Sequence, residues 1–245
     1  MFHRDRIINI EDLPQVFKTR EIVRITHGGV SKRKINYRIK NLLKRGKLFK
    51  ISKSIYSRTA NIFYIGVYLY KGYIGFSSAL YLHSLKTEVS SEIYVCTSAH
   101  KKKQRVLGRI IIPVNMSKQQ YGAEFILVEG DEILVSTYPK TIFDMLSVPK
   151  YANYFDMYRA LNERKLTKKE WKELLYYATD SSLTDIRRTG YALEGLAPAW
   201  FLKRLYKLSR EGSRISYFFK HKNINYNSRW EIYDSINVRQ WFNAI

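Results

Sequence analysis

The clearest pattern of apolar and polar positions lies in residues 30–58, VSKRKINYRIKNLLKRGKLFKISKSIYSR. Positions 35, 39, 42 and 43 are apolar, a spacing that places them on one side of an α-helix. We expect this helix to begin at Ser31 and to end at Gly46, because glycine readily adopts the left-handed conformation that closes many helices. Two short alternating runs, KLFKI and SIYSR, follow and predict a hairpin around Ser52 and Lys53.

The opposite side of this helix is basic. The residues of the helix and hairpin that we expect to contact DNA are Ser31, Lys32, Arg33, Lys34, Tyr37, Lys40, Asn41, Lys44, Lys50 and Lys53. No aspartate or glutamate occurs from residue 22 to residue 87. A face that is only solvated normally mixes both signs of charge, because unrelieved repulsion lowers stability. The pattern therefore favours nucleic-acid binding over a helical cap with merely solvated charges.

Two shorter helices are expected before this stretch. The first begins at Ile10 and buries positions 13, 16 and 17, and the second begins at Thr19 and buries positions 22, 23 and 25. His27 and two glycines then break the second helix and turn the chain. Helix, turn, helix and basic hairpin in this order predict a winged helix, in which the later helix enters the DNA major groove and the hairpin holds its flank.

Composition supports a polyanionic partner. The chain has 245 residues and a formal net charge of +22, and nucleic acid is the commonest partner for such a charge. A membrane surface is the rival partner, but no apolar run approaches the roughly 20 residues of a membrane-spanning helix, and the first residues lack the apolar core of a signal peptide. The single cysteine, Cys96, cannot form an intramolecular disulfide, so we expect a cytoplasmic protein.

The middle of the chain predicts strands. Residues 62–70 are apolar and aromatic, and residues 76–85 suggest a helix capped by Ser77 or Ser78. Strands are expected at residues 92–97, 106–114, 123–128 and 131–137, with Glu129 and Gly130 as a hairpin turn between the last two. The sequence HKKKQR, residues 100–105, is either a second phosphate-contacting loop or a solvated hairpin tip.

The remainder predicts helices. They are expected at residues 138–147, 154–161, 167–178, 183–196 and 199–208, and Thr167 with Glu170 has the spacing of a capping box. The basic and aromatic tail could add a strand and a helix. The expected class is therefore α+β, with a winged-helix domain at 1–60 and a second α+β domain at 61–245. The second domain divides into a strand-rich part (61–137), a helical part (138–210) and an unassigned tail (211–245).

Several of these segments resemble a known family when they are taken in order. The segments are SIYSR, GFSSALYLHSL, EIYVCT, STYPKTIFDML and RTGYALE, and together they span residues 10–197 with their surroundings. The series resembles the AbiEi antitoxins of type IV toxin–antitoxin systems, which join a winged helix to an α+β antitoxin domain. The resemblance implies an antitoxin that represses its own operon and opposes a nucleotidyltransferase-like toxin.

The residues in these motifs have two interpretations. Those that would contact a partner or maintain the fold are Thr141, Asp144, Arg187, Arg188, Tyr191 and Glu194. For RRTGYALE the structural interpretation is favoured, since Arg188 could pair with Glu194 or Asp185 within one helical bundle.

Catalytic patterns are sparse. The five histidines lack the spacing of a zinc site, and no phosphate-binding glycine loop, serine elbow or HExxH helix occurs. Glu124, Asp131, Glu132 and Asp144 are the carboxylates that a metal-dependent nuclease could use, although acids at hairpin tips are usually only solvated. We therefore expect no enzyme, metal or cofactor. A third hypothesis, a stand-alone nucleic-acid-binding protein, is weakened by the absence of the aromatic signature of RNA-recognition motifs.

Overall fold

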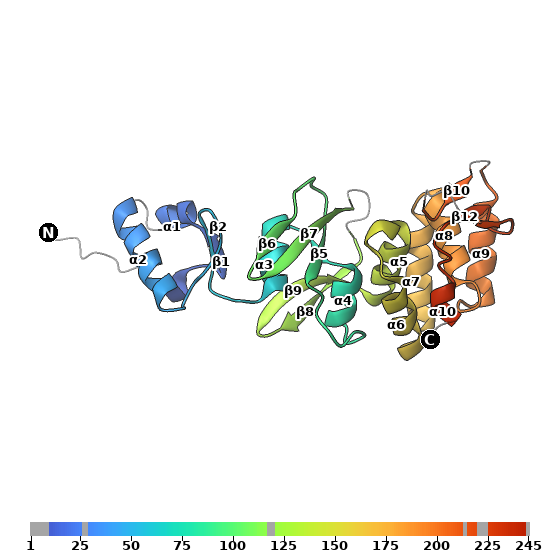
Figure 1. Ribbon diagram of the computed structural model, residues 1–245, viewed down its shortest axis with the longest axis horizontal. Helices are drawn as coiled ribbons and strands as arrows, with labels where there is room; N and C mark the ends of the chain where they lie inside the picture. The colour runs from blue at the N-terminus through green and yellow to red at the C-terminus, as the bar shows by residue number, and fades with distance from the viewer. Residues whose placement is uncertain (1–9, 26–28, 117–120, 213–214, 220–224, 244–245) are drawn as a thin grey trace.

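The computed structural model describes residues 10–25, 29–116, 121–212, 215–219 and 225–243, and its parts follow one another along the long axis (Figure 1). Helices and several sheets are combined, consistent with the α+β class. Within these residues, no helix combines the length and the apolar character needed to cross a bilayer.

The N-terminal part contains a short sheet and two helices. Its elements are η1 (Ile10–Asp12), β1 (Val16–Lys18), α1 (Thr19–Ile25), α2 (Lys32–Lys44), β2 (Phe49–Ser52) and β3 (Ile55–Ser57). The strands are antiparallel in the order β1-β3-β2. Apolar side chains from these elements form a separate small core around Phe17, Ile22, Ile35 and Leu42.

The predicted helix at residue 10 is wrong beyond Asp12. Only one 3-10 turn forms there, and residues 16–18 join the sheet beside β3. Pro14 has no amide hydrogen and restricts the residue before it, so a helix cannot run smoothly through this position. Positions 13, 16 and 17 are nevertheless buried, as expected. Ile25 is not buried but 46% exposed at the end of α1, and the expected turn at His27 lies outside the described residues.

Helix α2 and the hairpin agree closely with the pattern. Ser31 is the N-cap of α2, and its hydroxyl accepts a hydrogen bond of 3.3 Å from the Lys34 amide. Ile35 and Ile39 are buried on the inner side. After the helix Gly46 has φ of +66°, the left-handed conformation expected of a glycine stop.

The central part is a six-stranded mixed sheet. Its strands are β4 (Tyr73–Ile74), β5 (Glu92–Thr97), β6 (Gln104–Val106), β7 (Arg109–Asn115), β8 (Ala123–Val128) and β9 (Asp131–Ser136), in the order β6-β7-β5-β4-β9-β8. Helix α3 (Ile62–Tyr70) packs on the sheet face that carries Val95, and α4 (Phe76–Leu82) contributes Phe76 and Leu80 to the core on the opposite face.

Four local predictions for this part can be compared with the structure, and three of them need correction. The expected strand 106–114 is divided into β6 and β7 by a turn at Leu107 and Gly108, which have φ of 48° and 83°. Residues 100–105 are not a hairpin tip, because β5 and β7 are parallel. Neither Ser77 nor Ser78 caps α4, since its N-cap is Gly75. The turn at Glu129 and Gly130 is present.

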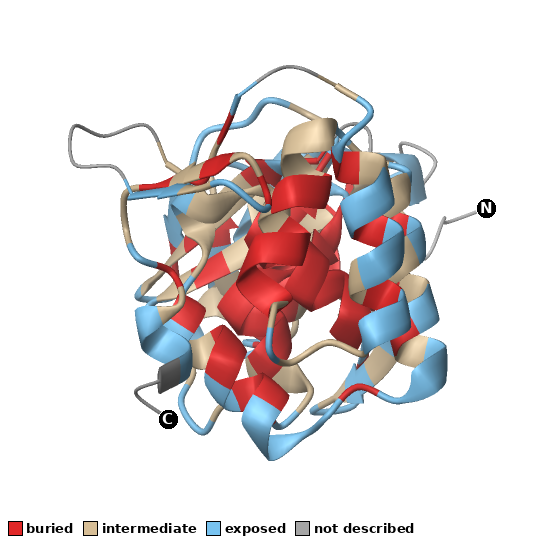
Figure 2. Cartoon of the chain, turned by 90° about the vertical axis from the view of Figure 1, so that its right-hand side faces the viewer, coloured by how far each residue is buried: buried red, intermediate tan, exposed pale blue. Residues whose placement is uncertain are grey.

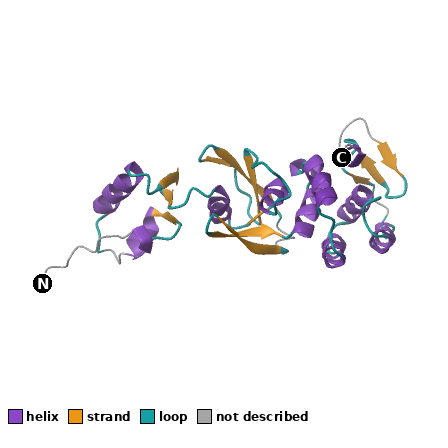
Figure 3. Cartoon of the chain, turned by 90° about the horizontal axis from the view of Figure 1, so that it is seen from below, coloured by secondary structure: helices purple, strands orange, loops and turns teal. Residues whose placement is uncertain are grey.

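The C-terminal part is a helical bundle with a small sheet. Its elements are α5 (Tyr138–Ser147), η2 (Pro149–Tyr151), α6 (Tyr154–Glu163), α7 (Lys168–Thr179), α8 (Leu183–Leu193), α9 (Ala199–Ser209), β10 (Ser216–Tyr217), β11 (Asn225–Asn227), β12 (Ile232–Asp234) and α10 (Gln240–Asn243). The capping box of Thr167 and Glu170 is formed. Buried residues fill the middle of this bundle (Figure 2), which lies at the end farthest from α2 (Figure 3).

The N-terminal part is packed directly on the sheet. Val16 and Ile51 join the core beneath α3. The Asp131 carboxylate, at the start of β9, accepts hydrogen bonds from Gln15 at 3.2 Å and from Thr59 at 3.0 Å. The orientation of α2 relative to the sheet is therefore set by apolar packing and by a buried carboxylate.

Candidate nucleic-acid interface

Helix α2 presents its basic side to solvent. The exposed residues from the expected set are Ser31, Lys32, Arg33, Lys34, Tyr37, Lys40, Lys44, Lys50 and Lys53, whereas Asn41 is half-buried. Tyr37 is 67% exposed, so its ring and hydroxyl are accessible beside the basic side chains of the helix. Among the described residues, no carboxylate forms an ion pair with Arg33, Lys40 or Lys44. Their charges are thus available to an external anion.

A hollow of about 660 Å³ separates α2 from the turn of the β2–β3 hairpin. Lys32 from the helix and Lys53 from the turn both line it, so the fold brings these two expected residues together. Lys18, Arg20 and Arg24 complete its basic lining, and none of the residues that line it is acidic. Of these three residues only Arg24 lies in the stretch without acidic residues, so no sequence signal pointed to Lys18 and Arg20.

A second hollow continues this basic surface toward the central sheet. It shares Lys18 and Arg20 with the first and is also lined by Lys71, Lys101 and one acidic residue, Glu21. The Lys101 ammonium donates a 2.9 Å hydrogen bond to the carbonyl of Leu69. Partial burial lowers the pKa of Lys101, and the ammonium groups of Lys71 and Lys18 add to this effect. The HKKKQR segment therefore adjoins the N-terminal basic surface through Lys101.

Thr141 and Asp144 lie in the interior rather than on a surface. Asp144 is fully buried, accepts a 3.1 Å hydrogen bond from the Tyr73 hydroxyl and forms an ion pair with Lys140. The Thr141 hydroxyl is 2.9 Å from the carbonyl of Thr137, to which it donates. Burial raises the pKa of the Asp144 carboxyl, although the Lys140 ammonium opposes this shift. The hydrogen bond from Tyr73 joins α5 to β4, and the other contacts stabilise α5 itself.

The RRTGYALE motif holds the tail against the bundle. Arg187 is fully buried and donates to the carbonyls of Ser209 and Gly212, each at 2.9 Å through its Nη2. Arg188 donates to the carbonyl of Tyr217 at 3.0 Å. Of the two expected partners of Arg188, Asp185 forms the ion pair, at 3.4 Å, whereas Glu194 pairs with other arginines.

The second half of the motif makes the same connection. Tyr191 donates a 3.0 Å hydrogen bond to Asp234 in β12, and Glu194 forms an ion pair with Arg239. A methyl group on Gly190 would overlap the indole ring of Trp230, which is fully buried. The tail that sequence reasoning left unassigned is thus part of the bundle core.

The four carboxylates considered for a nuclease are not assembled into one site. Asp144 is enclosed beside Lys140, and Asp131 accepts hydrogen bonds from the N-terminal part rather than lying solvated at a turn. Glu132 is exposed on β9, and Glu124 lies on β8. Over the described ranges, no three His, Cys, Asp or Glu side chains are grouped so that they could hold a metal ion.

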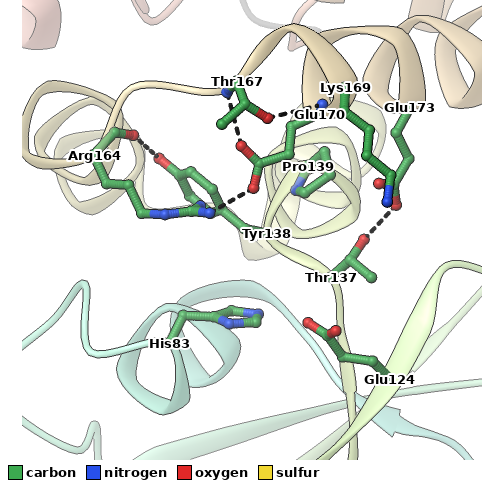
Figure 4. Close-up of a pocket in the computed structure, with 10 residues that line it drawn as sticks. All are labelled: His83, Glu124, Thr137, Tyr138, Pro139, Arg164, Thr167, Lys169, Glu170 and Glu173. Atoms are coloured by element: carbon green, nitrogen blue, oxygen red, sulfur yellow. Dashed lines mark hydrogen bonds and ion pairs between the residues drawn. The ribbon is translucent and has the colours of Figure 1, made fainter.

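Glu124 lines a polar cleft of about 450 Å³ between the central sheet and the bundle (Figure 4). Most polar groups around this cleft bind one another. Thr137 donates to Glu173 at 2.7 Å, and Arg164 pairs with Glu170 at 2.5 Å. A ring nitrogen of His83 lies 2.7 Å from the carbonyl of Ser136. Glu124 itself is exposed to solvent.

Comparison with known proteins gives a likeness in fold. No family model and no curated protein matches this chain. Among solved structures, the chain is similar to the crystal structure of the RV2827C protein from Mycobacterium tuberculosis, with a TM-score of 0.65. The match covers 96% of this chain and 90% of that chain at 10% sequence identity. At this identity the likeness concerns the fold alone.

Proposed function

We propose that this protein is a DNA-binding transcriptional regulator whose N-terminal residues form a winged helix. One observation carries the proposal, namely that α2 presents exposed basic side chains whose surface continues into the hollow lined by Lys32 and Lys53. Because a B-DNA major groove is about 12 Å wide, it accepts an α-helix with its side chains. The helix and the hairpin would then lie against the same duplex.

Different residues would have different roles on the duplex. Arg33 and Tyr37 project from the first turns of α2, where base edges are within reach, so they would contribute to sequence preference. Lys50 and Lys53 lie on the hairpin, where phosphates are the nearer partners. Lys101 would extend the phosphate contacts beyond the winged helix, because it shares a hollow with residues of the N-terminal part.

The test compares two matched pairs of lysines. Lys40 and Lys44 are exposed at positions i and i+4 of α2, and Lys203 and Lys207 have the same spacing and exposure on α9. We expect Lys40→Ala/Lys44→Ala to weaken duplex binding and to reduce the slope of log affinity against log salt by up to about 1.8, since each phosphate contact contributes about 0.9.

The variant Lys203→Ala/Lys207→Ala removes the same charge from α9. It should leave the affinity for the duplex and the salt slope nearly unchanged. Fluorescence anisotropy of a labelled duplex, titrated at several salt concentrations, measures them with the full chain. Equal losses in the two double variants would mean that net charge alone attracts DNA, and the assignment to α2 would be wrong.

We further propose that the regulator is an autorepressing antitoxin that acts in the cytoplasm. The resemblance of STYPKTIFDML and RTGYALE to AbiEi antitoxins supports this proposal. Because their polar residues are largely buried, these motifs would preserve the antitoxin fold. If the neighbouring gene encodes a nucleotidyltransferase-like protein, its expression alone should arrest growth and co-expression of this chain should restore it. If growth arrest persists on co-expression, this chain is not the antitoxin of that neighbour, and the hypothesis of a stand-alone regulator would be favoured.

A further inference from the structure

The two edges of the central sheet are built differently. Strand β6, at one edge, has three residues, includes Arg105 and directly follows three lysines. Charged and short edge strands discourage pairing with other chains. Strand β8, at the other edge, has six residues, and Phe125 and Leu127 within it are each 70% exposed. The β6 edge is therefore short and basic, whereas β8 is longer and carries two exposed apolar side chains.

The register of β8 places Phe125 and Leu127 on one face of the sheet. β8 pairs with β9, placing Phe125 opposite Leu134 and Leu127 opposite Glu132. Ile126 points to the other face and packs toward the core beneath α3. Phe125 and Leu127 thus share the face opposite α3. Within the described residues, no further strand pairs with the free side of β8, so its backbone groups there are open to an added strand.

Charge around this edge is opposite to that of the whole chain. Residues 119–139 contain four acidic residues and no lysine or arginine, although the chain carries +22. Glu124, Glu129 and Glu132 are the exposed acids, and they flank the apolar pair on β8. Glu124 also lines the polar cleft between the sheet and the bundle (Figure 4). This edge therefore attracts cations, whereas the surface of α2 attracts anions.

We propose that β8 binds an extended segment of a partner protein by strand addition, and that this segment carries aliphatic residues flanked by lysine or arginine. The added backbone would hydrogen-bond to the free side of β8. Aliphatic side chains would cover Phe125 and Leu127, and flanking cations would meet Glu124, Glu129 and Glu132. The proposal goes beyond DNA binding and does not depend on it.

A second copy of the chain is a poorer occupant. β8 and its turn contain Glu124 and Glu129 but no basic residue, so antiparallel pairing of two β8 strands would bring carboxylates together. Charge complementarity instead selects a basic segment. Because the protein as a whole repels cations, binding of a basic peptide would also require a local site.

The experiment uses the full chain and synthetic octapeptides labelled with fluorescein. KKVTVTKK provides aliphatic residues between basic ends, EEVTVTEE reverses the charges, and a third peptide has the four central amides of KKVTVTKK methylated. We expect saturable binding of KKVTVTKK, and binding at least about tenfold weaker for the methylated peptide, because it cannot donate to the strand. EEVTVTEE should show no binding that depends on β8.

Variants locate the site. Phe125→Ser/Leu127→Ser should weaken KKVTVTKK binding by about tenfold or more, whereas Tyr176→Ser, which removes an aromatic side chain 58% exposed on α7, should not. Glu124→Gln/Glu132→Gln preserves shape and should also weaken binding, so the test survives if the serine variant fails to fold. DNA retardation by these variants should be unchanged, which separates this proposal from the DNA-binding one.

Three results would overturn the proposal. They are failure of KKVTVTKK to bind, binding that the β8 variants do not change, and a dimer in sedimentation experiments that Phe125→Ser/Leu127→Ser dissociates. The last result would make β8 an interface between two copies of this chain.

Discussion

Replacement of Asp144 by alanine should strongly destabilise the protein. Asp144 and Lys140 lie one turn apart on α5, and both are fully buried. With the carboxylate removed, the Lys140 ammonium would keep one hydrogen bond, to the Tyr73 hydroxyl at 3.1 Å. Its remaining neighbours include three aromatic rings whose centroids lie 5.5 to 5.7 Å away. Those rings cannot replace an ion pair.

The expected cost follows from this burial. Removing one partner of a buried ion pair typically costs about 3–5 kcal/mol, because the other charge stays desolvated. For a chain of this length each kcal/mol lowers the melting temperature by about 2–4 °C. Asp144→Ala should therefore melt about 6–20 °C lower than the original protein. Circular dichroism at 222 nm, a wavelength that reports helix content, follows the transition.

The double variant Lys140→Met/Asp144→Leu separates charge from volume. Apolar residues of similar size often replace a buried ion pair with little loss of stability, so the double variant should melt well above Asp144→Ala. If Asp144→Ala melted within about 2 °C of the original protein, the ammonium would not be trapped as described. If both variants were equally unstable, lost packing rather than an unpaired charge would be the cause.

Further predictions concern DNA, acid and catalysis. In competition binding on altered duplexes, Arg33→Ala should lose about 1–3 kcal/mol of discrimination at one base pair, whereas Lys53→Ala should weaken all sequences alike. Partial burial acts to raise the pKa of Glu170, but hydrogen bonds from Thr167 and Arg164 hold it below the ordinary 4.5. This stabilisation is present above the ordinary pKa and is lost as pH falls through the folded one. Glu170→Gln should therefore flatten the pH dependence of melting between about pH 6 and about pH 3. Plasmid DNA incubated with the protein and Mg²⁺ should remain intact, as an agarose gel would show.

Local signals were sufficient for α2 and the hairpin. The Ser31 cap, the apolar spacing and Gly46 all act within a few residues, so the sequence alone specified the start, the buried side and the end of the helix. The sequence does not predict strand β1, because β1 pairs with the distant strand β3. Val16 lies opposite Ser57, about 40 residues later in the chain. A three-residue strand has too short a pattern to reveal such a distant pairing.

The residues of the candidate site were likewise predicted where they depend on local sequence and missed where they depend on distant contacts. The basic residues of α2 could be listed from the sequence, but the hollow that adds Lys18 and Lys101 depends on tertiary packing. Asp131 looked like a solvated turn acid, yet its partners Gln15 and Thr59 lie 116 and 72 residues away in sequence. Likewise, the fully buried Arg187 has its carbonyl partners in Ser209 and Gly212, 22 and 25 residues away in sequence. Such environments are set by contacts that no local window contains.

The attachment of the N-terminal part to the sheet has a mechanical consequence. Asp131 receives Gln15 and Thr59, and Val16 and Ile51 share the core beneath α3, so a swivel of α2 would have to break apolar packing and two hydrogen bonds together. The N-terminal part and the central sheet therefore form one rigid unit rather than two domains joined by a flexible linker. Seated on a duplex through α2, the molecule would project its helical bundle away from the DNA at a fixed angle (Figure 1). A load applied to β8 would pass along the β8–β9 hairpin directly to Asp131, and from there to the N-terminal part that we propose binds DNA.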